Sequence, residues 1–297
     1  MNYVLHLVIT FEIFAIVAVG LNVLVGKAGL LSLATAGFFA LGAYAYALFS
    51  IAIGLGPILA ILGSIAVALT ASVLLWLPSL RLKGDFYVLA TLAVQVCLFA
   101  AMQNWYSADA PAGSLANLTN GPFGMSGIPG IAGAARGVEQ AVVTVGTSSL
   151  IFAACILIAR RVDLSLWGRT LECLRDDELV VRSIGKPARL IKLETAALAC
   201  SFAGCGGAIY AAHIGFVDPS SASLDESILM LSMVLIGGTG NLRGPLAGAL
   251  LLVLLPEVLR WIGLPSSVAA NVRVAIYGLM LILVAHFRPQ GLFGGRS

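Results

Sequence analysis

The stretch YVLHLVITFEIFAIVAVGLNVLV, residues 3–25, contains one acidic residue, Glu12, and no lysine or arginine. An apolar run of about 20 residues is long enough to cross the hydrocarbon core of a bilayer as a helix. A helix satisfies its own backbone hydrogen bonds, which water cannot do inside lipid. The stretch therefore predicts a transmembrane helix, and it decides the fold class.

The rest of the chain repeats this pattern, since 60% of all residues are hydrophobic, 10% are charged and the mean hydropathy is +1.01. Soluble domains carry charges at about a quarter of their positions. We expect one all-α, polytopic transmembrane bundle over residues 1–297, with about nine spans and a range of eight to ten. The predicted spans are 3–25, 28–53, 57–80, 86–106, 140–159, 193–212, 227–241, 246–262 and 274–287. The seventh is short and rich in glycine, which favours a broken or re-entrant helix.

The basic residues predict how the bundle is oriented. With nine spans, 14 of the 17 lysines and arginines fall on one face, and only Arg136, Arg260 and Arg273 fall on the other. Loops rich in lysine and arginine stay in the cytoplasm. We therefore expect the N-terminus outside and the C-terminus in the cytoplasm. No lysine or arginine precedes Lys27, so the first helix lacks the positively charged start of a cleaved signal and is expected to be retained.

Several function classes find no support in the sequence. No G-x-x-x-x-G-K-[ST] phosphate loop occurs, so we expect ATP binding of that kind to be absent from this chain. No catalytic constellation stands out, and the five cysteines show no metal-ligand or disulfide spacing. A basic tail or zinc finger, which would indicate a nucleic-acid partner, is also missing. We predict no catalytic residue, no metal and no nucleic acid.

Two loops are informative. The outer loop, residues 107–139, is rich in glycine, proline, serine and asparagine, which form turns. It is either a plain connector or a shaped external mouth, with Asn120, Gly121 and Gly124 as the candidate residues. The inner loop, residues 160–192, carries eight basic and five acidic residues.

The inner loop predicts a short amphipathic helix. Leu171, Leu174, Val181 and Ile184 recur at spacings that place them on one helix face. Gly185, followed by a proline, is a typical stop signal. The apolar face could meet either membrane lipid or a partner protein. The acidic residues of the loop would be repelled by anionic lipid, which favours a protein.

Polar residues inside the predicted spans are the candidates for a translocation path. An ionisable group at that depth costs about 2.5–3.5 kcal/mol even on a lenient scale, and it usually faces the bundle interior. Glu12 and Gln95 lie deepest, and each could line a path or join helices. The candidate path residues are Glu12, Asn22, Ser32, Gln95 and Asn104.

Six segments, in order along the chain, resemble the permease subunits of ABC importers for branched-chain amino acids. They cover most of the chain, and together they are more specific than any one alone. The segments are GLLSLATAGFFALGAY at 29–44, RLKGDFYVLATL at 81–92, LTNGPFGMSGI at 118–128, WGRTLECLRDDE with SIG at 167–178 and 183–185, GGTGNLRGP at 237–245, and FRPQGL at 287–292.

The resemblance implies a multi-pass subunit of the inner membrane. Its implied partners are a second, similar permease, two cytoplasmic ATPase subunits and a periplasmic substrate-binding protein, within membrane lipid. ATP and magnesium would be bound by the ATPases, and this chain would bind no cofactor and would not be an enzyme. The resemblance makes 160–192 a coupling loop that docks on an ATPase. In that loop Arg169, Glu172, Arg175 and Asp176 would supply charge, Leu171, Leu174 and Ile184 would supply anchors, and Gly185 would end the helix.

Two departures from the family pattern concern the solute. Gln95 stands where the family often has glutamate, and Asn120 stands where a glycine is commoner. Urea, short amides and aromatic acids therefore remain alternatives to branched-chain amino acids. A secondary transporter driven by an ion gradient is a different class, for which Glu12 is the deep carboxylate. A structural subunit without a path is a third class.

Overall fold

The computed structural model describes residues 2–76, 82, 84–110, 113–114, 116–131, 138–261, 266–287 and 291–293. Within its helices, the side chains of 2, 138–141, 259–261, 266–271, 273–274 and 285 are not described. The described residues form eleven α-helices and one short pair of strands. The fold is therefore all-α, as the sequence predicts.

The helices are α1 Asn2–Asn22, α2 Thr35–Ile51, α3 Pro57–Trp76, α4 Asp85–Asn104, α5 Val138–Leu164, α6 Leu166–Asp176, α7 Glu178–Ser183, α8 Ala188–Ile214, α9 Leu224–Gly237, α10 Arg243–Trp261 and α11 Ser266–Phe287. A π-helical turn, Val23–Lys27, continues α1. Two 3-10 turns lie at Gly121–Phe123 and Pro219–Ala222. Strands β1 Met125–Ser126 and β2 Phe216–Val217 pair antiparallel.

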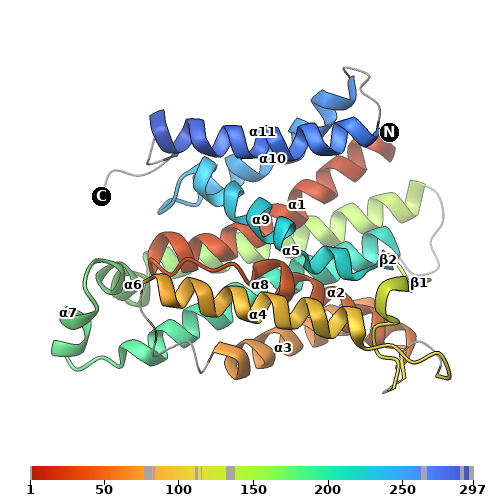
Figure 1. Cartoon of the computed structure of the whole chain (residues 1–297), viewed down its shortest axis with the longest axis horizontal. Coiled ribbons are helices and arrows are strands. Elements are labelled where there is room, and N and C mark those ends of the chain that lie inside the picture. Colours follow the sequence, from red (N-terminus) through yellow and green to blue (C-terminus); the bar gives the residue numbers. More distant parts are fainter. Residues whose placement is uncertain are drawn as a thin grey trace.

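Helices α1, α2 and α8 form the centre of the bundle, with α3 and α4 along one side and α10 and α11 along the other (Figure 1). In the apolar 18-residue segment of each helix, 72% of the residues of α1 and 67% of those of α8 are buried, compared with 22–28% in α3, α4 and α5. The less buried helices present apolar side chains outward, among them Leu62, Leu89 and Leu157.

Small residues bring α2 and α8 into backbone contact. A Cβ added to Gly207 would lie 1.9 Å from the carbonyl oxygen of Phe39, and one added to Gly42 would lie 2.2 Å from that of Gly204. Glycine is required at both positions because any side chain would force the helices apart. Close packing of this kind holds helices together where lipid is as apolar as the side chains.

Five helices, α1, α3, α4, α5 and α8, are long and apolar enough to cross a membrane among the described residues. Helix α2 and residues Ala275–Val284 of α11 are apolar but shorter. Each of the nine predicted spans overlaps one described helix, but residues 77–81 and 262 lie outside the described part. The number of spans therefore stays a prediction.

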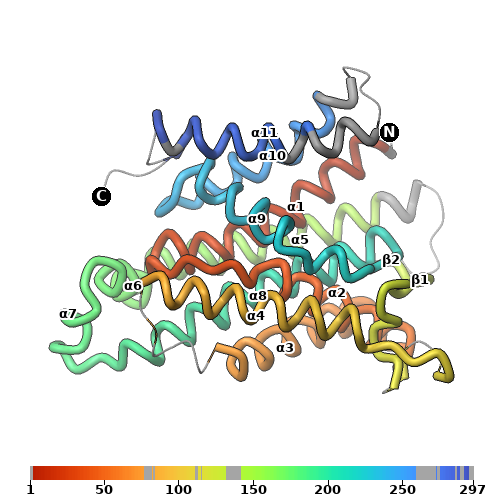
Figure 2. The backbone as a smooth tube through the Cα atoms, viewed as in Figure 1, coloured from red at the N-terminus to blue at the C-terminus, as the bar shows by residue number. Residues whose placement is uncertain are grey.

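The second predicted span begins later than expected. Residues 28–34 were expected to be helical, but they are irregular, and α2 starts only at Thr35. Figure 2 shows the chain leaving α1 at the end where α6 lies and running back without a helix before α2 begins. Gly29 has a positive φ of 66°, which an ordinary helix does not contain.

Candidate functional site

Helices α2 and α9 begin next to each other inside the bundle. Each starts only after a non-helical segment, residues 28–34 before α2 and a 3-10 turn before α9, and we call these two the interrupted helices. The free N–H groups at the start of α2 are capped from other elements, because its own N-cap, Ala34, makes no side-chain cap. Ala36 N–H donates to the hydroxyl of Ser227 on α9 at 3.0 Å, and Gly37 N–H donates to Oε1 of Gln95 on α4 at 2.8 Å. The start of α9, itself a 14-residue helix, therefore lies beside the start of α2.

Gln95 joins these two helix starts. Its Nε2 donates to the carbonyl oxygens of Ala222 at 2.6 Å and Ser223 at 3.3 Å, just before α9. The residue is 1% exposed, and its amide bonds to both interrupted helices at once. Of the two roles open from the sequence, this geometry is that of a residue that holds helices together.

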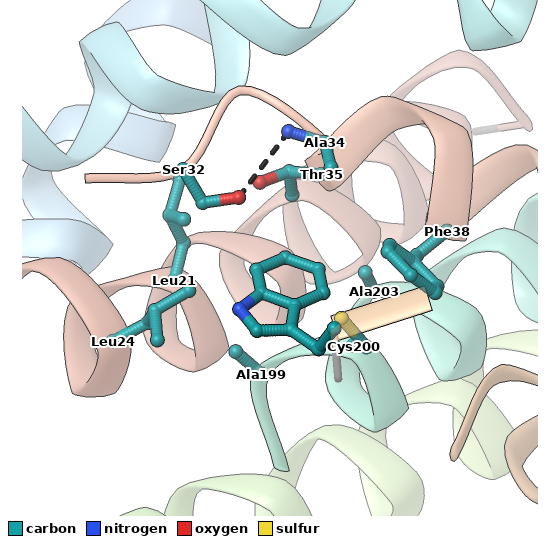
Figure 3. Close-up of a pocket in the computed structure, with 10 residues that line it drawn as sticks. Leu21, Leu24, Ser32, Ala34, Thr35, Phe38, Ala199, Cys200 and Ala203 are labelled. Carbon is teal, nitrogen blue, oxygen red and sulfur yellow. Dashed lines mark hydrogen bonds between the residues drawn. The ribbon is translucent and has the colours of Figure 1, made fainter. Parts of the chain in front are cut away.

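A small cavity lies next to the start of α2 (Figure 3). Its volume is about 10 Å³, and Ser32 and Thr35 are its polar lining residues. Ser32 accepts a hydrogen bond from Ala34 N–H at 3.2 Å (Figure 3). Such a volume holds about one water molecule. The described residues therefore close this cavity to anything as large as an amino acid.

The other candidate path residues lie at different depths. Both carboxylate oxygens of Glu12, which is 5% exposed, accept hydrogen bonds from Ser148 and Ser149 on α5. Asn22, at the end of α1, accepts from Gly240 N–H at 3.2 Å. Asn104 is exposed at the last turn of α4 and donates to its own helix. The five candidates are therefore dispersed over the bundle.

The structure reveals two further carboxylates that the sequence reading passed over. Glu226 and Glu257 line a cavity of about 280 Å³ between α1, α9, α10 and α11, together with His6 and Thr10. Glu226 was missed because the seventh span was predicted to begin at residue 227, whereas α9 begins at Leu224. Glu257 lies within the predicted eighth span, and a search for acidic residues inside spans could have found it.

The outer loop has a defined shape. Asn120 has a φ of 60°, and its Nδ2 donates to Gly124 O at 2.9 Å. Gly121 and Gly124 also have positive φ, and a Cβ on Gly124 would lie 2.4 Å from Val217 O. Asparagine is one of the few L-residues that visit this region routinely. Asn120 can therefore hold a conformation that glycine adopts without strain.

The inner loop forms two helices where one was predicted. The backbone of Asp177 is extended, with φ −155° and ψ 114°, and its carboxylate accepts a hydrogen bond from Leu179 N–H at 2.7 Å. Asp177 therefore ends α6 and caps α7, because aspartate stabilises free N–H groups at a helix start. The predicted stop is confirmed, since Gly185 follows α7 with a φ of 77°.

The predicted apolar face is also different. Leu171, Leu174 and Val181 are buried within the chain itself, against a cluster that includes Val23 and Ala28. Ile184 is 62% exposed and does not share their environment. The break at Asp177 changes the direction of the chain, so the spacing of a continuous helix no longer applies. Leu171 and Leu174 are thus internal anchors, and the exposed apolar residues of α7 are Leu179 and Val180.

An ion pair fixes α7 to α8. Lys192 Nζ on α8 lies 3.0 Å from Oε2 of Glu178, and Arg182 bonds to the other oxygen of the same carboxylate. Burial alone would raise the pKa of Glu178, but the hydrogen bonds and positive charges of Lys192 and Arg182 outweigh it and lower the pKa. Arg169, Arg175 and Asp176 are all exposed, and Nε of Arg175 lies 3.2 Å from Oδ1 of Asp176.

Comparisons with known proteins identify the family of the chain. The family described as "Branched-chain amino acid transport system / permease component" matches residues 3–285. The chain is 32% identical to the "High-affinity branched-chain amino acid transport system permease protein LivM" of Escherichia coli K12, over 94% of this chain and 67% of the relative. The protein of the same name from Salmonella typhimurium gives the same three values.

A more distant relative is the "Probable branched-chain amino acid transport permease protein LivM" of Methanocaldococcus jannaschii. It is 23% identical over 81% of this chain and 69% of its own length. No solved structure matches the chain significantly. A permease component is a multi-pass transport subunit and not itself an enzyme. By the length of the family match and the identity to its relatives, the chain belongs to the family of branched-chain amino acid transport permease components.

Proposed function

We propose that this chain is one membrane subunit of an ATP-driven importer that carries branched-chain amino acids across the inner membrane. The observation that carries the proposal is the family match over residues 3–285, with relatives named for this transport. Urea, short amides and aromatic acids are the competing solutes. The proposed chain is a single transmembrane permease domain with nine spans, its N-terminus outside and its C-terminus in the cytoplasm.

We assign the proposed partners to the two ends of the bundle. Helices α6 and α7 lie at the end of the bundle opposite β1 and β2 (Figure 1). We assign α6 and α7, in residues 160–192, to the docking of a cytoplasmic ATPase, and the outer loop, residues 107–139, to a periplasmic binding protein. A second permease would complete the complex. ATP and magnesium would bind to the ATPase subunits.

The docking surface consists of residues that the chain leaves exposed. These are the apolar side chains of Leu179, Val180 and Ile184, which are 65%, 51% and 62% exposed, and the exposed charged residues Arg169 and Asp176 of α6. Apolar anchors surrounded by polar groups are typical of protein interfaces. Leu171 and Leu174 are buried between α6 and the rest of the chain, so a charge at either would disrupt the permease itself.

Ile184→Arg tests the docking. The charge should reduce recovery of the ATPase subunits with the tagged permease complex, because an exposed apolar anchor is lost while the permease still folds. Phe123→Arg is the matched control, since Phe123 is 67% exposed in the outer loop. Full ATPase recovery with Ile184→Arg would contradict the docking surface.

The solute is tested by uptake into vesicles that contain the complete complex. Labelled leucine should accumulate only when the ATPase subunits face the vesicle interior and ATP is enclosed there. Unlabelled valine and isoleucine should compete with it, and urea should not. Uptake that persists without the ATPase subunits would indicate an ion-driven transporter instead.

A further inference from the structure

Helix α6 is tied to the interruption between α1 and α2. Nζ of Lys27, the last residue of the π-helical turn, lies 2.6 Å from Oε1 of Glu172 on α6. Nη1 of Arg175 donates to Gly26 O at 3.1 Å. A Cβ on Gly29 would lie 2.6 Å from Cγ of Arg175, so α6 also packs directly on the irregular segment.

Apolar side chains also join α6 to the segment around the π-helical turn. Leu171 and Leu174 of α6 pack with Val23 and Ala28, on either side of Lys27. A π-helical turn is rare in proteins and is frequent at functional sites. The residues that the structure describes thus place helix α6 against a turn of unusual geometry, and residues 28–34 lead directly from this turn to α2.

Lys27 also has a second carboxylate within reach. Oδ1 of Asp163, at the end of α5, lies 3.7 Å from Nζ, outside hydrogen-bond distance. The same oxygen is buried and has no hydrogen-bond partner. The side chain of Lys27 is 9% exposed and that of Asp163 is 19% exposed, whereas that of Glu172 is 46% exposed. An unpaired ammonium at this depth would be strongly unfavourable.

We propose that Lys27 is a positioning residue with two alternative partners, and that it transmits the movement of α6 to the start of α2. In the described state Lys27 is hydrogen-bonded to Glu172 and forms a longer ion pair, at 3.7 Å, with Asp163. When α6 moves, Glu172 withdraws and the ammonium pairs with Asp163, so the buried charge stays compensated in both positions. Two discrete arrangements are what a switching contact needs. The inference rests on the proposed function, since the movement of α6 would come from an ATPase.

The direction of transmission follows from the chain. Residues 28–34 connect Lys27 to Thr35, where α2 begins and where Ser32 lines the small cavity. The caps from Ser227 and Gln95 hold this helix start in the described state. A shift of the π-helical turn would therefore move the start of α2, at the place where α2 and α9 meet.

The experiment uses the complete complex in vesicles, with Lys27→Gln and Glu172→Gln. Both variants should still recover the ATPase and hydrolyse ATP, but uptake per ATP should fall about tenfold, within the usual range of coupling between sites. Glu172 is half exposed, so Glu172→Gln keeps the test valid if Lys27→Gln does not fold. Arg189→Gln, which removes a charge from the exposed first turn of α8, is the matched control.

A second readout separates transmission from simple stability. After replacement of the exposed Cys97 and Cys173 by serine, and of Cys200, which lines the same cavity, by alanine, Ser32→Cys reports the reactivity of the cavity toward a small thiol reagent. Reactivity should change on ATP binding with Lys27 present, and should stay constant with Lys27→Gln. Unchanged uptake per ATP in Glu172→Gln, or a retained reactivity change in Lys27→Gln, would overturn the proposal. Failure of the unsubstituted permease to recover any ATPase would instead overturn the proposed function.

Discussion

Gln95 gives the sharpest test of the fold around the interrupted helices. Gln95→Leu keeps the approximate volume of the side chain but removes all its hydrogen bonds. It leaves the N–H of Gly37 and the carbonyl of Ala222 without the partners they have at 2.8 and 2.6 Å. Each such buried group costs about 1–3 kcal/mol when left unsatisfied, so we expect a loss of about 2–6 kcal/mol in the free energy of unfolding.

The free energy of unfolding can be measured by titrating the purified permease with sodium dodecyl sulfate in mixed micelles, with circular dichroism as the signal. Gln103→Leu is the matched control, because Gln103 lies on the same helix but is only partly buried, near the C-terminal end of α4. It should change stability by less than about 0.5 kcal/mol. A Gln95→Leu variant as stable as this control would refute the view that Gln95 joins α2 and α9.

Two further predictions concern the ends of the bundle. Asn120→Gly should lower the melting temperature in detergent less than Asn120→Val, because both lose the hydrogen bond to Gly124 O but only the β-branched residue pays about 1–3 kcal/mol at a φ of 60°. At the other end, the lowered pKa of Glu178 stabilises the fold above the ordinary value of 4.5, and this contribution is lost as the pH falls through the folded-state pKa. The stability advantage over Glu178→Gln should therefore be largest near neutral pH and disappear in acid; an advantage independent of pH would contradict the ion pairs with Lys192 and Arg182.

The inner loop shows where sequence patterns stop being informative. The spacing of Leu171 and Leu174 correctly indicated an amphipathic helix, because helical periodicity is a local property. Whether that face meets a partner or the chain itself depends on what lies beside it in space. Val23 and Ala28 cover it, and they are more than 140 positions away along the sequence.

The sequence by itself determined that this is an all-α membrane bundle, because long apolar runs leave the backbone no other way to satisfy its hydrogen bonds in lipid. Its ordered motifs also determined the family. Only the tertiary structure decided that α2 starts at Thr35, that Gln95 joins two interrupted helices, and that Lys27 lies between Glu172 and Asp163. These features arise from contacts between distant segments, and the composition of one segment cannot specify the partner that will lie against it.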